Sequence, residues 1–369
     1  MPQTLPLVGW ITLVTAGCFG IPIHARGGKR EIPAEIAALG AATVEVPAGE
    51  GVTLRGIWVA QQGPPVLLLY GSGMGIAGSR EAIKMLHQGG YSVLCCDYRG
   101  TGFSGGRWGT SRTLDDDARA LWEWLLREKG GPGGVVGISI GSVAGAGLAS
   151  HPKPPAAIVL DRPVDPKNVI YRFVRSELGP VSSAISHLLV RAKCDVDMAA
   201  ALAAAKAPTL VVLPEYDRLM PPEDGRRMTA AHSNAVEVVT MPGGHLSSHL
   251  VEPVKWRSAV LDHLDRHLRP GQPPTGGRRP PEPPAIVTAF RVEGRKVTVT
   301  LDRNAEGVTL LFLGTKGNGL ALVDAPKREF ALELTRRQWR KLGKRLFAVR
   351  VAPPGVARPI GSRWLTPPP

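Results

Sequence analysis

Short apolar runs alternate with helical patterns along residues 43–268 of this 369-residue chain. The runs at 43–46 and 52–60 are expected to pair as an opening hairpin. Six further runs are rich in Val and Leu, as buried strands of a parallel sheet are: 66–70, 92–96, 135–138, 157–160, 210–213 and 236–240. Strands that alternate with helices predict an α/β fold with a doubly wound, mainly parallel sheet.

The clearest helical pattern between these strands places Ala118, Leu121, Trp122 and Leu125 on one face. Thr113 is the expected N-cap of this helix, and the acidic residues 115–117 are expected to complement its dipole. A second long helix is predicted over residues 252–268. Six histidines in or beside helical patterns are expected at surface or boundary positions: His87, His151, His187, His232, His263 and His267.

Residues 270–284, PGQPPTGGRRPPEPP, are too rich in Pro and Gly for a helix or a central strand, so they predict a linker. Alternating runs follow at 286–292, 296–301, 308–313, 330–334 and 346–351, with a turn expected at Gly317-Asn318-Gly319. This spacing predicts a small β-sandwich, similar to immunoglobulin or fibronectin III domains. The expected divisions are an N-terminal apolar segment (1–30), an α/β domain (31–269), the linker (270–284) and a basic β-domain (285–369).

The N-terminal segment has an uncharged stretch over residues 5–25, which is long enough to span a bilayer. It contains Gly and Pro, and it lacks the positive charge that usually precedes a signal sequence. Thr15-Ala16-Gly17-Cys18 is similar to a bacterial lipoprotein processing site, with Cys18 as the lipidated residue. The segment predicts a membrane or cell-envelope location. The alternatives are an apolar arm packed on the core and a cytoplasmic protein.

The formal net charge of +14 lies mostly after residue 270. Residues 336–345, RRQWRKLGKR, place six cations around Trp339. Such a cluster raises the local potential, so an anionic membrane surface or a charged envelope polymer is an expected partner. A charged helix or loop that only keeps the domain soluble is the alternative. A nucleic-acid partner is not expected, because no recognisable reading fold accompanies the cluster.

The run Val135-Val136 leads into Gly137-Ile138-Ser139-Ile140-Gly141, which matches the G-x-S-x-G pattern of a nucleophile elbow. In an elbow the serine lies on a sharp turn between a strand and a helix, where flanking side chains would clash. The residues that follow, 143–149, are small and favour a helix packed closely behind the serine. Ser139 is therefore the candidate nucleophile.

A serine hydroxyl needs a base and an orienting acid, which follow in the chain order Ser, Asp, His on such a fold. Asp217 lies just past one predicted strand, and His245 lies just past the next. Glu215 could replace Asp217 as the acid, but the spacing from Asp217 to Pro221 favours Asp217. Asp97 also ends a strand, in a D-Y-R-G context that favours a structural loop role.

The backbone N–H groups of Ser72 and Ile140 are the expected oxyanion hole, since such donors stabilise the charge that develops during acyl transfer. Ser72 belongs to Tyr70-Gly71-Ser72-Gly73-Met74-Gly75, which follows a predicted strand; a flexible glycine loop is the alternative reading. No metal-ligand cluster is visible, and acyl transfer by a triad requires none. No metal or organic cofactor is therefore expected.

Five motifs together resemble the α/β-hydrolase superfamily, and within it the lidless serine hydrolases grouped with esterases, thioesterases and prolyl-oligopeptidase-like peptidases. They are LLLYGSGMG, CCDYRGTGFSGG, GISIG, YDRLMPP and PGGH, within residues 43–268. The resemblance implies an α/β-hydrolase fold with Ser139 as nucleophile, Asp217 as acid and His245 as base. Relatives usually carry His-Gly where this chain has Tyr70-Gly71.

The segment 162–207 is short for a large cap, so a small helical cover and an open acyl pocket are expected. The leading hypothesis is a serine hydrolase that cleaves a small or exposed acylated substrate (an ester, thioester or amide) through an acyl-enzyme. The alternative hypothesis is a catalytically silent α/β-hydrolase scaffold whose basic C-terminal domain binds a polyanion.

Overall fold

The computed structural model describes residues 32–107, 111–166, 168, 197–215, 217, 219–245, 249, 253–272, 287–305, 308–314, 317–323, 327–342 and 346–351. The N-terminal segment with Cys18, the linker from residue 273 on and most of the predicted cover lie outside these residues. Their expected roles therefore stay predictions. No helix in the described ranges combines the length and the apolar composition that a bilayer crossing requires.

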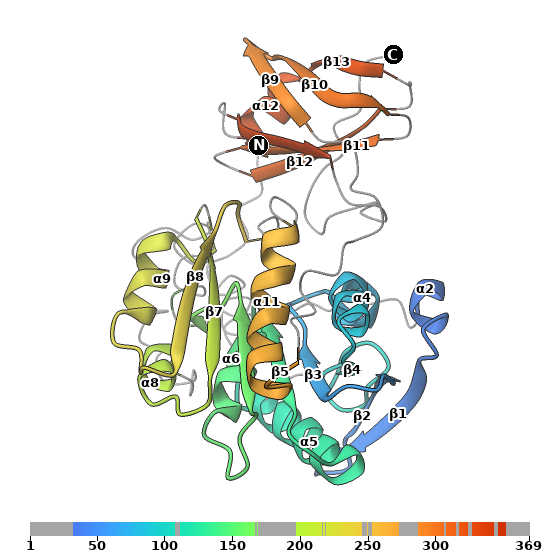
Figure 1. The fold of residues 1–369 in the computed structure, drawn as a ribbon, viewed down its shortest axis with the longest axis vertical. Helices are drawn as coiled ribbons and strands as arrows, with labels where there is room; N and C mark the ends of the chain where they lie inside the picture. Colours follow the sequence, from blue (N-terminus) through green and yellow to red (C-terminus); the bar gives the residue numbers. More distant parts are fainter. Residues whose placement is uncertain are drawn as a thin grey trace, which may run out of the picture. The chain divides into compact units, whose positions relative to one another are not determined.

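The main sheet has eight strands in the order β1-β2-β4-β3-β5-β6-β7-β8 (Figure 1). The hairpin β1–β2 and the pair β2–β4 are antiparallel, whereas β4, β3, β5, β6 and β7 run parallel. The expected strands are confirmed to within one residue at each end: β1 (Ala42–Pro47), β2 (Thr53–Val59), β3 (Pro65–Leu69), β4 (Ser92–Cys96), β5 (Gly134–Ile138), β6 (Ala157–Asp161), β7 (Thr209–Pro214) and β8 (Val236–Met241).

Helices connect the parallel strands. The connections from β4 to β5, β5 to β6, β6 to β7 and β7 to β8 contain α5 (Ser111–Lys129), α6 (Gly141–Leu148), α8 (Met198–Ala203) and α9 (Pro222–Thr229), in that order. The connection from β3 to β4 contains α4 (Arg80–Gln88). Arg269, just past α11 (Pro253–Leu268), donates to the Gly89 carbonyl at the end of α4 at 2.8 Å, so these two helices share a face. Short helices α2 (Ala34–Ala37) and α3 (Gly75–Gly78) complete the described helices of this part.

The start of α5 differs from the prediction. The helix begins at Ser111, so Thr113 lies inside it and is not the N-cap. Asp115, Asp116 and Asp117 therefore fall beyond the first turn. Asp117 is completely buried and accepts hydrogen bonds from Arg99 instead of complementing the dipole. Local patterning overlooked this role because the partner of Asp117 is 18 residues away in the sequence.

His263 is the one described histidine whose predicted surface or boundary position is wrong, since its side chain on α11 is 2% exposed. Its Nε2 lies 3.3 Å from the Pro208 carbonyl. Burial, followed by the charge of His267, lowers the pKa of His263 from 6.5 to about 4. The folded protein therefore keeps His263 neutral down to a lower pH than the unfolded chain does.

We expect this histidine to make folding weaker in acid. Between pH 6.5 and about 4 the unfolded chain protonates His263 while the folded chain does not, so the unfolding free energy falls as pH drops through this window. The shift corresponds to about 3 kcal/mol, lost between pH 6.5 and 4. Urea unfolding at pH 7 and pH 4.5 should show a smaller loss in His263→Gln than in the unmodified protein. Equal losses would contradict the assignment.

The C-terminal part contains two three-stranded antiparallel sheets, β13-β10-β9 and β12-β11-β14. The strands are β9 (Val287–Glu293), β10 (Lys296–Ala305), β11 (Val308–Gly314), β12 (Gly317–Val323), β13 (Lys327–Glu333) and β14 (Leu346–Val351). Val297 and Val299 of one sheet join Leu310, Phe312 and Val349 of the other in a single buried cluster. The small all-β prediction is confirmed.

One strand of this part was missed, because Gly317-Asn318-Gly319 was expected to be a turn. These residues begin β12 instead, where Gly317 pairs with Gly314 and Gly319 pairs with Phe312 of β11. Gly and Asn have low intrinsic strand propensity, and pairing with a buried apolar neighbour overrides it.

Contacts between residues divide the chain into two compact units. The first comprises Met1–Leu213, Leu219–Thr240 and Ser258–Gly276, and the second comprises Pro214–Arg218, Met241–Arg257 and Gly277–Pro369. The segments that carry Asp217 and His245 therefore group with the C-terminal strands in this division. The boundaries expected from the sequence, at 30, 269 and 284, stay predictions.

Candidate active site

Ser139 lies on a sharp turn between β5 and α6. Its φ of 53° is left-handed, which is uncommon for a residue other than glycine and marks stored strain at functional sites. The Ser139 N–H donates to the Asp161 carbonyl at 2.9 Å, and the Ser142 N–H donates to the Ser139 carbonyl at 3.0 Å. The turn is thus held from β6 on one side and from α6 on the other.

The two glycines of the elbow are required by close backbone approach. A Cβ on Gly137 would lie 2.5 Å from the Gly141 carbonyl oxygen, and a Cβ on Gly141 would lie 2.1 Å from the Leu69 carbonyl oxygen. Real Cβ atoms do not come this close to backbone atoms. The pattern in the sequence therefore has the steric cause that was expected of it.

Asp217 and His245 form a close pair. His245 Nδ1 lies 2.6 Å from Asp217 Oδ2, the length of a strong hydrogen bond to a carboxylate. The Asp217 side chain is completely buried and that of His245 is 11% exposed. A buried carboxylate on Nδ1 fixes the ring and leaves Nε2 as the nitrogen that can accept a proton. Asp217 follows β7 and His245 follows β8, as Ser139 follows β5.

Glu215, the alternative acid, and His249, a second histidine four residues past His245, are placed differently. Glu215 is exposed, and its backbone N–H donates to the Met241 carbonyl at 2.9 Å. The ring of His249 lies 5.7 Å from the ring of Trp256, in a tilted aromatic contact. The geometry therefore favours Asp217 over Glu215 as the partner of His245.

The loop that follows β3 passes beside the nucleophile. A Cβ on Gly71 would lie 3.2 Å from the Ser139 Cβ, a tight contact that glycine avoids. Gly73 and Gly75 have φ values of 73° and 58°, which also favour glycine. Within the described part of the chain, no backbone hydrogen bond uses the N–H of Ser72 or of Ile140. Their expected role as an oxyanion hole stays a prediction.

Tyr70, at the position where relatives usually have histidine, is buried and anchors this loop. Its hydroxyl donates to Asp97 Oδ1 at 3.0 Å and accepts the Tyr98 N–H at 3.1 Å, and the two tyrosine rings lie 4.5 Å apart. Burial, followed by the charge of Asp97, raises the pKa of Tyr70 well above its usual value. Tyr70 is therefore a neutral hydrogen-bonding residue at this position.

Asp97 has the structural loop role that its context favoured. It accepts the Phe103 N–H at 2.9 Å, and a Cβ on Gly102 would lie 1.9 Å from its Oδ2. Burial raises the pKa of Asp97, and the donors Phe103, Tyr70 and Ile76 oppose that rise. The role of Tyr70 and Tyr98 in this network was not predicted. The only signal in the sequence was the unusual Tyr-Gly in place of His-Gly.

The described ranges contain no group of three or more His, Cys, Asp or Glu residues arranged to hold a metal ion. Cys95 and Cys96 are both buried and free, and burial raises the pKa of each thiol. They therefore pack as small apolar residues in β4. That activity requires no cofactor stays a prediction.

Comparisons with known proteins support the fold. Residues 64–178 match the family described as the alpha/beta hydrolase fold. An uncharacterized protein of Mycobacterium tuberculosis H37Rv, Rv2307c, is 29% identical over 285 residues, which cover 72% of this chain and 95% of that protein. The human protein ABHD12B is 27% identical over 225 residues, covering 55% of this chain and 61% of that protein.

Among solved structures, the esterase Pf2001 of Pyrococcus furiosus superposes with a TM-score of 0.55 at 23% identity, covering 63% of this chain and 94% of the esterase. At this identity the likeness concerns the fold. The elbow, the sheet order and the family match point to one conclusion. The chain has an α/β-hydrolase fold.

Proposed function

We propose that this protein is a serine hydrolase with Ser139 as nucleophile, His245 as general base and Asp217 as the acid that orients it. The hydrolase fold supports hydrolytic activity in general. The observation that carries the finer assignment is the 2.6 Å hydrogen bond between Asp217 Oδ2 and His245 Nδ1. A silent scaffold has no need for a buried carboxylate that holds an imidazole by one nitrogen.

In the proposed reaction, Ser139 Oγ attacks the carbonyl carbon of the substrate while His245 Nε2 takes the hydroxyl proton. Asp217 stabilises the resulting imidazolium. The tetrahedral intermediate collapses when its bond to the leaving group breaks, and His245 returns the proton to the departing alcohol, thiol or amine. Water then attacks the acyl-enzyme by the same route, releasing the acid and restoring Ser139.

The N–H groups of Ser72 and Ile140 are proposed to bind the oxyanion of that intermediate. Donors held in place before the reaction begins lower its barrier because they need no reorganisation. Ile140 is the residue after the nucleophile, and Ser72 lies on the loop whose Gly71 passes the Ser139 Cβ. The substrate class proposed is an ester, thioester or amide with a small or exposed acyl group, in keeping with the short segment 162–207.

The test is labelling of the full-length protein with a fluorophosphonate probe, followed by p-nitrophenyl esters of rising acyl length. A serine hydrolase should be labelled once per chain and should hydrolyse short esters without added metal. Absence of both labelling and hydrolysis would favour the silent scaffold.

A second function is suggested by the basic helix α12 (Arg336–Leu342). Arg336, Arg337 and Arg340 are exposed, and Trp339 is half-buried against the core of the C-terminal strands. Thr335 caps the helix: its hydroxyl accepts the Gln338 N–H at 3.2 Å, and the Gln338 side chain accepts the Thr335 N–H at 2.8 Å. The arginines are therefore presented on an ordered helix. We propose that α12 binds an anionic lipid surface.

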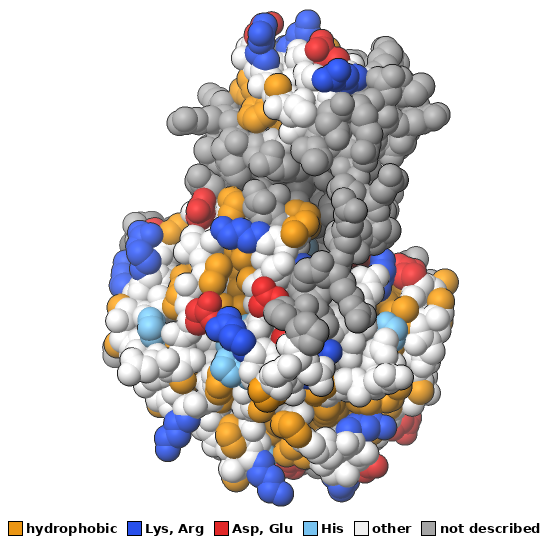
Figure 2. Space-filling model, in the orientation of Figure 1, with side chains coloured by type: hydrophobic (Ala, Val, Ile, Leu, Met, Phe, Trp, Pro, Cys, Tyr) orange, Lys and Arg blue, Asp and Glu red, His pale blue; other side chains and the backbone are white. Residues whose placement is uncertain are grey.

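The rest of the basic domain carries acidic as well as basic side chains on its surface. Arg291 and Arg295 lie near Glu293 and Glu333, and acidic and basic side chains occur together on the face seen in Figure 2. Mixed charges of this kind suit a solvated surface. The proposal therefore rests on α12 and not on the net charge of the domain.

We expect the full-length protein to co-sediment with vesicles that contain anionic lipid and not with neutral vesicles. Each basic residue near such a surface contributes about 1 kcal/mol, and salt screens the attraction. Replacing Arg336, Arg337 and Arg340 with Gln should reduce binding strongly. A matched control that replaces Arg127, Arg226 and Arg266 changes the net charge equally and should retain binding. Equal loss in both variants would show that only total charge matters.

A further inference from the structure

The loop after β3 is held at its start by residues of the loop after β4. The Tyr98 hydroxyl donates to the Tyr70 carbonyl oxygen at 2.9 Å. That carbonyl belongs to the peptide whose nitrogen is Gly71, one residue before the proposed donor Ser72. A peptide plane is rigid, so fixing its oxygen also fixes the direction in which the chain enters the loop.

Asp97 of the loop after β4 holds the same residue by its side chain, since its carboxylate accepts the Tyr70 hydroxyl at 3.0 Å. Asp97 thus helps to anchor the residue before the loop. Beyond this anchor the loop residues 71–74 contain two glycines, which have little conformational preference of their own.

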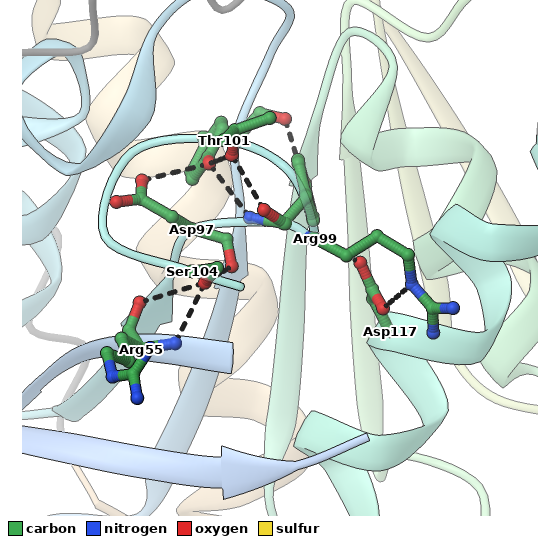
Figure 3. A network of polar contacts seen from close by, with 8 residues as sticks. Arg55, Asp97, Arg99, Thr101, Ser104 and Asp117 are labelled. Carbon is green, nitrogen blue, oxygen red and sulfur yellow. Dashed lines mark hydrogen bonds and ion pairs between the residues drawn. The ribbon is translucent and has the colours of Figure 1, made fainter. Parts of the chain in front are cut away.

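The loop after β4 is in turn attached to the rest of the sheet (Figure 3). Arg99 donates from its backbone N–H and from Nε to the buried Asp117 of α5, at 2.8 and 2.6 Å. Ser104 accepts the Arg55 N–H of β2 at 2.8 Å and donates to the Asp97 carbonyl at 2.5 Å. The loop after β4, which anchors the loop after β3, is therefore itself held by hydrogen bonds to α5 and to β2.

We propose that Tyr98 and Tyr70 are positioning residues for the oxyanion hole, which hold the Ser72 N–H where the developing oxyanion requires it. This inference rests on the proposed function. Neither tyrosine touches the substrate: Tyr98 is 1% exposed and Tyr70 is 2% exposed. Their effect passes through the Tyr70–Gly71 peptide.

The test compares Tyr98→Phe with Tyr91→Phe in the full-length protein. Tyr91 is a matched control, because it is equally buried and its hydroxyl donates to Asp265 at 2.5 Å, away from the candidate site. Tyr98→Phe should lower kcat for p-nitrophenyl butyrate about tenfold to a hundredfold, less than complete removal of an oxyanion donor, with KM unchanged within about twofold. Tyr91→Phe should leave kcat unchanged even if its Tm falls.

A trifluoromethyl ketone provides a readout that a purely structural role would not move. Its adduct with a serine carries the same oxyanion, so its Ki should rise in Tyr98→Phe by the factor by which kcat/KM falls. If Tyr98→Phe does not fold, Tyr70→Phe replaces it. Its kcat should fall and its Ki should rise in the same way, by smaller factors. Wild-type kcat in both folded variants would overturn the positioning role.

Ser139→Ala separates this inference from the proposed function. If Ser139→Ala is inactive and Tyr98→Phe has wild-type kinetics, only the positioning role fails. If Ser139→Ala keeps full activity, the serine mechanism fails and the positioning role fails with it.

Discussion

Ser139→Ala is expected to lose about 10⁵- to 10⁶-fold in kcat for short p-nitrophenyl esters, since removing the nucleophile of a serine hydrolase costs that much. Fluorophosphonate labelling should disappear as well. The fold should survive, because the Ser139 side chain is partly exposed and the elbow is held by backbone hydrogen bonds that alanine keeps. Unfolding by urea should change by no more than about 1 kcal/mol.

Ser150→Ala is the matched control, since Ser150 is an exposed serine just past the same helix α6. It should label and hydrolyse as the unmodified protein does. Labelling that persists in Ser139→Ala would assign the probe to another serine and remove the basis for the triad. Loss of activity in both variants would point to damage of α6 and not to chemistry.

The eight strands of the main sheet were predictable because their patterning is local. β4, β5 and β6 are buried along their whole length, and each is a short, mostly apolar run followed by a polar residue. The elbow was predictable for a similar reason, since Gly137 and Gly141 meet backbone atoms close by in the sequence or on the neighbouring strand β3. Strong local constraints leave clear signals.

Features that depend on distant partners were missed. Asp117 is buried because Arg99 reaches it from another segment, and His263 is buried because α11 packs beside the Pro208 carbonyl. Neither fact follows from helical periodicity, which marks the face of a helix but not its neighbour. β12 was missed because its first residues favour a turn and only pairing with β11 makes them a strand.

The candidate site has features of both kinds, some marked by local patterns in the sequence and others dependent on distant partners. The order Ser, Asp, His and the strand ends were enough to nominate all three residues. The anchoring of the loop after β3 by Tyr70 and Tyr98 could not be predicted, because it joins positions 28 residues apart through a side chain and a carbonyl. A departure from the usual His-Gly raised a question in the sequence that only the hydrogen bonds could answer.

Asp217→Asn is expected to lower kcat by roughly 10⁴-fold while KM changes little. An amide in place of the carboxylate would present a donor to His245 Nδ1, so the ring would carry its proton on Nε2 and could not accept one from Ser139. The exchange keeps the shape of the side chain, which is buried, so a small loss of stability should accompany the kinetic effect.

Glu215→Gln is the control that tests the choice of acid. Glu215 lies two residues earlier on the same connection, and its side chain is exposed. An exposed carboxylate without a place on the imidazole should contribute little, so kcat should stay within about twofold of the unmodified protein. A larger loss in Glu215→Gln than in Asp217→Asn would transfer the role of the acid to Glu215. The 2.6 Å bond to His245 would then be a structural contact, and His245 would need a different partner to act as a base.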